Sequence, residues 1–173
     1  MYNEWSLDIL YKGLDDEKYK EDFRKLENLI ENIESFSKSL GNSQEEEKLL
    51  ITGIEYMEEL EVLGGFLGSY LSLRQSVNTS DSQVVNELNK LEKMYSEISK
   101  PLAVIKKWIA GIKDIDKYME KHPKIKSYEF FINNIKEEAK HLLSDDVEEV
   151  IAKLNISAGS AWSNMQGYLT SIL

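Results

Sequence analysis

Apolar residues recur at spacings of three and four along most of the chain, and this spacing constrains the fold more than any other feature. Residues three or four apart share one face of an α-helix, so the pattern predicts helices that each bury one side. The first is predicted over 16–40, capped by Asp15 or Asp16 and ended by Gly41 with Asn42. Its apolar face consists of Tyr19, Phe23, Leu26, Ile30, Ile33, Phe36 and Leu40.

A second, longer helix is predicted from about Ser43 to Gln75, because Ser43 followed by Glu46 matches a capping box and no breaker follows. It would be about 50 Å long, whereas a compact domain of this length has a radius of gyration of only ~16 Å. The molecule is therefore expected to be elongated. Glycines inside an exposed helix are unfavourable, so those of this segment are expected to allow close packing or a bend. They are Gly53, Gly64, Gly65 and Gly68.

The rest of the chain continues the helical pattern. The polar stretch 76–82 separates the second helix from a third, for which Thr79, Ser80 and Asp81 are candidate caps. Pro101 is expected to bend this helix or to start a fourth. His122, ahead of Pro123, is expected to end a short helix. The further helices are predicted over 114–121, 128–142, 144–154 and from 158 to the end.

No segment reads convincingly as a strand. The sequence thus predicts an all-α fold, an elongated antiparallel helical bundle with a long second helix and no β-sheet. We expect a single helical domain over 1–173, with a lead-in over 1–14.

Composition excludes several classes of function. Lysine and arginine number 21 against 31 aspartates and glutamates, and the net charge of -10 repels nucleic acid. No apolar run approaches the roughly 20 residues that span a bilayer, and the start of the chain is acidic where a secretory signal is basic. Cysteine is absent. We therefore expect a cytoplasmic protein that binds neither nucleic acid nor membrane.

No complete catalytic or metal-binding pattern occurs in the chain. His122 and His141 are nineteen residues apart, whereas a helical zinc site needs two histidines four apart with a glutamate between them. The segment 157–160, Ser-Ala-Gly-Ser, has no preceding strand and is interpreted as a helix start. Paired carboxylates such as Glu58 and Glu61 are interpreted as solvated helix faces. We predict no catalytic residue and no metal ligand here.

Arg74 is one of only two arginines in a chain that otherwise uses lysine for positive charge. A guanidinium is suited to binding a carboxylate in two-pronged geometry or to capping a helix end. The structural role is the favoured one.

The final segment, SAGSAWSNMQGYLTSIL over 157–173, resembles the end of the N-terminal helical region of oligoendopeptidase F and its relatives in the M3 family of zinc metallopeptidases. Three other segments resemble the same region, in the same order. They are Trp5-Ser6-Leu7-Asp8-Ile9-Leu10-Tyr11-Lys12-Gly13 near the start, Tyr70-Leu71-Ser72-Leu73-Arg74 with Asn78-Thr79-Ser80-Asp81, and His141-Leu142-Leu143-Ser144.

The resemblance implies a substrate-gating or channel-wall domain of a peptidase that hydrolyses short peptides. Its cofactor would be one zinc ion, held in a catalytic region that follows Leu173, so this chain alone is expected to be inactive and to hold no cofactor. The implied partners are that catalytic domain of the same polypeptide and short peptide substrates. The matched residues that are candidates for the substrate channel are Tyr70, Arg74, Trp162 and Asn164.

A free-standing helical module that binds a protein partner is the alternative. Whether the gene continues past Leu173 into a histidine and glutamate zinc motif separates the two hypotheses. Isolation from a catalytic half would leave apolar surface exposed, so we also expect the chain alone to form a homodimer.

Overall fold

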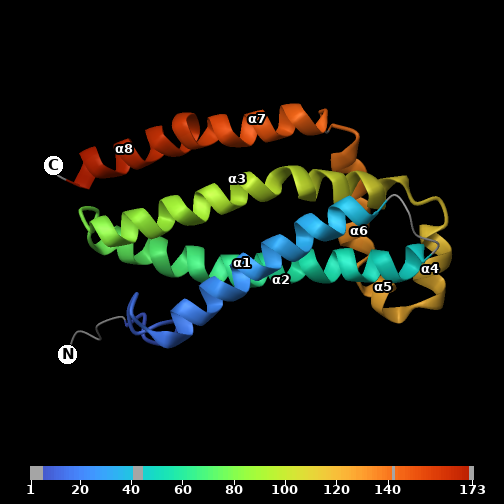
Figure 1. The fold of residues 1–173 in the computed structure, drawn as a ribbon, viewed down its shortest axis with the longest axis horizontal. Helices are drawn as coiled ribbons and strands as arrows, with labels where there is room; N and C mark the ends of the chain where they lie inside the picture. The colour runs from blue at the N-terminus through green and yellow to red at the C-terminus, as the bar shows by residue number, and fades with distance from the viewer. Residues whose placement is uncertain (1–5, 41–44, 142, 172–173) are drawn as a thin grey trace.

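The computed structural model describes residues 6–40, 45–141 and 143–171, and in these ranges the regular structure is helical throughout. Three long helices form the body of an elongated antiparallel bundle. The C-terminal part of the chain forms a further helical rod that lies along this bundle (Figure 1). The predicted all-α class is confirmed. None of the described helices is long and apolar enough to cross a membrane.

The first three helices are α1 (Glu17–Ser39), α2 (Glu46–Val77) and α3 (Ser82–Gly111). The carboxylate of Asp16 accepts a hydrogen bond from the Lys18 amide at the start of α1, and Asp81 caps α3 by accepting from the amides of Gln83 and Val84. Both capping predictions are confirmed. Ser43 of the predicted capping box, and the predicted stop at Gly41 and Asn42, lie outside the described residues.

Pro101 does not divide α3, which runs through it as one helix of 30 residues. The prediction of a separate fourth helix is therefore wrong, and the alternative of a continuation is correct. A proline removes one backbone donor inside a helix. Here the packing of neighbouring residues compensates for the lost hydrogen bond, because Ile98 and Ile105 flank the proline and are fully buried.

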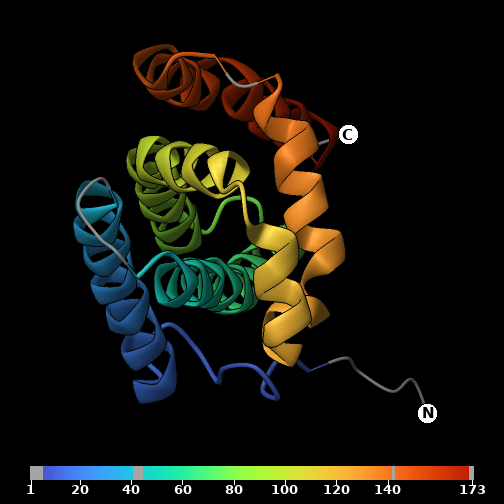
Figure 2. The same cartoon turned by 90° about the vertical axis from the view of Figure 1, so that its right-hand side faces the viewer.

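Three short helices follow at one end of the bundle: α4 (Ile115–Lys121), α5 (Pro123–Ser127) and α6 (Glu129–Ala139). His122 ends α4 as predicted, and Pro123 starts α5, which the sequence pattern did not predict. Proline is favoured at a first helical position because its missing amide has no partner there. These helices rise beside α2 and α3 and lead the chain to the rod (Figure 2).

The rod consists of α7 (Asp145–Asn155), a single π-helical turn η1 (Ile156–Ser160) and α8 (Ala161–Ser171). The sequence predicted a new helix beginning near Ala158. That boundary is wrong, because the chain passes from α7 to α8 without leaving helical geometry. The rod runs antiparallel to α3 (Figure 1).

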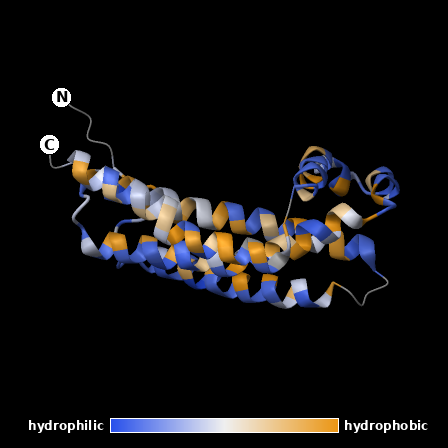
Figure 3. Ribbon diagram, turned by 90° about the horizontal axis from the view of Figure 1, so that it is seen from above, coloured by the Kyte–Doolittle hydropathy of each residue, from blue (hydrophilic) through white to orange (hydrophobic). Residues whose placement is uncertain are grey.

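The hydrophobic core lies between α1, α2 and α3 and extends to α4, α5 and α6. Hydrophobic and hydrophilic segments are interspersed along the helices (Figure 3). The predicted apolar face of α1 is confirmed, since each of its residues is buried. The largest fully buried side chains are Tyr70, Leu26, Ile33, Leu50, Ile54, Leu67, Leu71, Ile98, Ile105, Ile109, Ile115 and Ile125.

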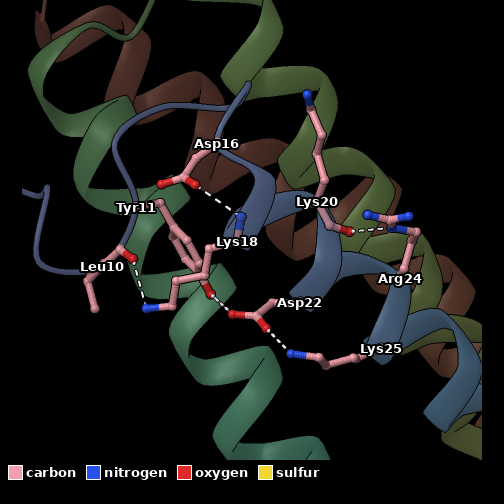
Figure 4. Close-up of polar contacts among 8 residues, drawn as sticks. All are labelled: Leu10, Tyr11, Asp16, Lys18, Lys20, Asp22, Arg24 and Lys25. Carbon is pink, nitrogen blue, oxygen red and sulfur yellow. Dashed lines mark hydrogen bonds and ion pairs between the residues drawn. The ribbon is translucent and has the colours of Figure 1, made fainter.

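A cluster of three tyrosines closes the end of the core near the lead-in. The ring centroids of Tyr11 and Tyr70 are 5.0 Å apart, and those of Tyr11 and Tyr19 are 5.4 Å apart, both edge to face. The hydroxyl of Tyr11 donates to Asp22 at 3.0 Å, and Asp22 pairs with Lys25 (Figure 4). Burial, followed by this hydrogen bond, raises the pKa of Tyr11 above its ordinary range. Tyr11 of the lead-in is thus part of the core.

Candidate functional site

Two adjoining cavities lie along the face that α2 and α3 share, and we call them together the α2–α3 furrow. Tyr95 lines both cavities. One half, the apolar half, has a volume of about 470 Å³, and the other has about 420 Å³, both within the usual range for binding pockets. We call the second the polar half because several polar side chains line it, although most of its surface is apolar. The apolar half is lined by Ile54, Met57, Glu58, Leu60, Glu61, Val62, Tyr95, Leu102, Lys106, Tyr128 and Phe131. The polar half is lined by Gly68, Ser72, Leu88, Leu91, Glu92, Tyr95, Ser96, Ala152, Asn155, Ile156 and Ser160.

Tyr95 reaches from α3 across α2 because α2 has a glycine opposite it. A Cβ atom on Gly64 would lie 1.8 Å from the Tyr95 hydroxyl oxygen and 2.9 Å from ring carbon Cζ. A Cβ atom on Gly53 would lie 3.3 Å from a ring carbon of Phe36, which is a tight approach, whereas one on Gly68 would make ordinary contact with Leu91 and one on Gly65 would meet nothing within 4 Å. The prediction that these glycines allow close packing is therefore confirmed for Gly53 and Gly64.

The rim of the apolar half is acidic. Glu58 accepts a hydrogen bond from the Tyr128 hydroxyl at 2.6 Å, which raises the pKa of Tyr128. Burial, with a smaller contribution from the Glu61 carboxylate, raises the pKa of Tyr95. Both phenols therefore stay protonated at neutral pH and present neutral hydroxyl groups to the furrow.

The polar half contains a buried hydroxyl without a partner. Ser96 is 6% exposed, and its Oγ is the one buried side-chain nitrogen or oxygen, among the described residues, that lacks a hydrogen bond. Ser72, Asn155 and Ser160 add further polar groups around it. An unsatisfied buried hydroxyl costs roughly 1–3 kcal/mol, and single π-turns such as η1 occur often at functional sites.

The rod turns its apolar side outward, away from α3. Lys100 of α3 holds the inner side of α7 through Asp146 at 2.8 Å and Glu149 at 3.2 Å. On α8 the inner side is made of small polar residues, and the hydroxyls of Thr79 and Ser171 lie 2.9 Å apart. We call the opposite side the outward face. Its exposed apolar residues are Val147, Val150, Ile151, Leu154, Trp162, Met165 and Leu169.

The structure brings two of the four candidate channel residues together, one in the core and one at its edge, and neither of them lines a cavity. Tyr70 is 1% exposed and packs between the rings of Tyr11 and Tyr19. Arg74, one turn later, donates to the Tyr70 hydroxyl at 3.3 Å and pairs with Asp81 at 3.4 Å. Arg74 thus joins the end of α2 to the capping residue of α3, and Tyr70 has no surface open to a ligand in this arrangement.

The other two candidates lie on opposite sides of α8. Trp162 is on the outward face and is 66% exposed. Asn164 lines a cavity of about 400 Å³ between α8 and the end of α2, together with Gln75, Ser76 and Thr79. Their contact with a substrate stays a prediction. The sequence pattern did not predict the furrow residues as a site. The glycines of α2 and the large Tyr95 in the next helix were the signal that could have indicated a close helix contact there.

No group of three histidine or acidic side chains that could hold a metal ion occurs within residues 6–40, 45–141 and 143–171. His122 contacts the carboxylate of Glu47, which ties the end of α4 to the start of α2.

The part of the chain that carries the outward face is similar to a region of known proteins. Residues 110–173, from the end of α3 through the rod, match the family model for the N-terminal region of M3 peptidases, described as oligopeptidase F. Oligopeptidase PepF of Bacillus subtilis (strain 168) is 22% identical over 159 residues, which covers 91% of this chain. The resemblance to the N-terminal region of oligoendopeptidase F is confirmed.

The oligopeptidase F match includes two of the segments that carried the resemblance, 141–144 and 157–173. The chain spans only 23% of the length of the Bacillus subtilis oligopeptidase. No solved structure matches the chain significantly.

Proposed function

We propose that this chain is the substrate-gating, channel-wall part of an oligoendopeptidase F-like zinc peptidase that hydrolyses short peptides. The observation that carries the proposal is the outward face of the rod, because it lies within the residues that match oligopeptidase F. A wall of a larger enzyme needs one side that packs on its own bundle and another that packs on the catalytic region. The rod has both sides.

The chemistry of the outward face supports the proposal that a partner covers it permanently and that it is not exposed to solvent. Contiguous exposed apolar patches on soluble proteins mark interaction sites. Segment 161–171 contains no charged residue, and Trp162 is 66% exposed. Tryptophan is enriched where interfaces are fully desolvated. The partner proposed for this face is the catalytic domain of the same polypeptide, in line with a relative of which the chain spans 23%.

The furrow, part of which lies between the bundle and the inner side of the rod, supports a role in contacting substrates. It is open, it combines an apolar with a polar half, and Tyr95 stands where the halves meet. Short peptides present both apolar side chains and backbone polar groups. The zinc ion belongs, in this proposal, to the catalytic region, and no described residue of this chain is assigned to it.

The experiment that tests the proposal measures cleavage of an internally quenched peptide in the presence of zinc, with the chain alone and with the polypeptide that its gene encodes. We expect the chain alone to give no zinc-dependent cleavage and the complete polypeptide to be active. Metal-dependent turnover by residues 1–173 would overturn the assignment of the chain as a wall without its own zinc site.

A free-standing interaction module is the second candidate, since the outward face would serve it equally well. The reading frame separates the two. If the codons after Leu173 lead into a histidine and glutamate zinc motif, the module hypothesis fails; an immediate stop codon would sink the peptidase proposal.

The outward face also leads us to expect self-association of the isolated chain. In sedimentation velocity at high protein concentration, the chain is expected to sediment as a dimer, and Trp162→Asp and Leu154→Asp to sediment as monomers. Burying an unpaired carboxylate in such an interface is strongly unfavourable. Val77→Asp is the matched control, because Val77 is 87% exposed at the end of α2. A strict monomer for the unmodified chain would contradict this prediction.

A further inference from the structure

The apolar half of the furrow has an accessible hydrophobic lining on three elements. Val62 of α2 and Phe131 of α6 are 53% and 37% exposed, and Leu102 of α3 is partly buried between them. A bulky apolar side chain that entered this half would remove these groups from water, which is favourable in proportion to the apolar area buried.

Carboxylates outnumber cations around this half, and the nearby cations Lys106 and Lys124 are each paired with another carboxylate, Glu138 and Glu55. Glu58, Glu59 and Glu61 lie close together on α2, and none of them forms an ion pair with a described residue. Lys106 is the cation in the lining, and its ammonium is paired with Glu138 at 2.8 Å. With a net charge of -10 on the whole chain, the potential at the rim is negative.

We propose that the apolar half of the furrow binds a peptide segment in which a bulky apolar side chain stands next to lysine or arginine. The apolar side chain fills the space between Val62, Leu102 and Phe131, and the basic neighbours lie against Glu58 and Glu61. This inference specifies which peptides the proposed function concerns. It rests on the proposed function in one respect, that the ligands are peptides.

The competing occupant is the outward face of a second copy of the chain. That face is apolar, α8 contains no basic residue, and Lys153, the basic residue of α7, is already paired with Glu149, so nothing there complements the three glutamates. Charge complementarity therefore favours the basic peptide, and self-association remains as an outcome that the experiment detects.

The test titrates the ¹⁵N-labelled chain with three blocked pentapeptides and follows amide resonances of α2 and α3. The first peptide has the sequence Ala-Lys-Phe-Lys-Ala; the second replaces both lysines with glutamine, and the third replaces phenylalanine with alanine. We expect the first peptide to bind on the order of 10-fold more tightly than either of the others, and its affinity to fall as salt screens the charges.

Paired variants locate the site. Val62→Asn is expected to weaken binding of the first peptide by on the order of 10-fold, whereas Val77→Asn, at the exposed end of α2, leaves it unchanged. Glu61→Gln is expected to weaken it by about two- to five-fold, while Glu59→Gln, which does not line the cavity, has a smaller effect. Thermal unfolding of each variant verifies that the fold is kept.

Three results would overturn the inference. The first is equal affinity for the lysine and glutamine peptides, and the second is an unchanged affinity in Val62→Asn. The third is a shift of the furrow resonances with protein concentration in the absence of peptide, which would place a second copy of the chain in the furrow. None of these depends on zinc-dependent cleavage, so failure of this inference and failure of the proposed function are distinguishable.

Discussion

Replacing Tyr70 with alanine is expected to lower the free energy of unfolding by about 3–5 kcal/mol, the usual cost of truncating a buried aromatic ring. Tyr70 is 1% exposed and lies between Tyr11 and Tyr19, so its removal leaves a cavity that two neighbouring rings cannot fill without moving. Arg74 also loses the hydroxyl to which it donates. Urea denaturation followed by circular dichroism measures the change.

Phe130→Ala is the matched control, because Phe130 is 78% exposed on α6 and lies outside both the furrow and the outward face. Its effect on the isolated chain is expected to stay within about 0.5 kcal/mol. The comparison also separates two roles for Tyr70. A substrate-channel residue would tolerate truncation with little loss of stability, so a small effect of Tyr70→Ala would contradict the packing role that we assign to it.

Adding one methyl group at Gly64 and one at Gly65 is expected to change stability in opposite directions. Alanine is favoured over glycine in a helix interior by up to about 1 kcal/mol. Gly65→Ala realises this gain, because nothing lies within 4 Å of the new atom. At Gly64 the new atom would overlap the Tyr95 hydroxyl. We expect Gly64→Ala to destabilise the fold by about 1–3 kcal/mol, as overpacking does.

A double-mutant cycle with Tyr95→Ala isolates this contact. With the Tyr95 ring removed, Gly64→Ala is expected to become neutral or stabilising, and the coupling free energy should exceed about 1 kcal/mol. Equal effects of Gly64→Ala with and without the ring would show that the two residues do not meet. The cycle uses unfolding free energies alone, so it needs no ligand.

Local signals in the sequence were sufficient for most of the helices. A carboxylate followed by the start of an apolar pattern located the ends that Asp16 and Asp81 cap, and the restriction that Pro123 places on its neighbour located the end of α4. These effects act within a few residues of the chain, which is why they can be read without knowing the fold.

Effects that depend on distant parts of the chain were not predictable in the same way. Pro101 is tolerated inside α3 because the helix is packed along its length, and sequence spacing alone left that choice open. The apolar pattern of α7 was read correctly, but periodicity identifies an apolar side without saying whether it faces the bundle or turns outward.

The candidate site shows the same division. Tyr70 and Arg74 were selected as atypical residues at a helix end, and they do lie together, yet their contacts are with Tyr19, Tyr11 and Asp81. The furrow arises where α2 and α3 meet, and which residues share that groove depends on their crossing. The glycine at position 64 is the clue that the crossing is close.

The π-turn η1 rotates the residues of α8 around the rod axis relative to those of α7. Its five residues, Ile156–Ser160, close wider rings than an α-helix does, so they turn the chain through less angle than five α-helical residues would. Val147 and Met165 are eighteen positions apart, a whole number of α-helical turns, and in an unbroken helix they would lie in line. The lost angle moves Met165 out of line with Val147 around the rod axis. Any surface that covers both α7 and α8 must therefore wrap around the rod as it passes η1, which a single straight helix cannot do.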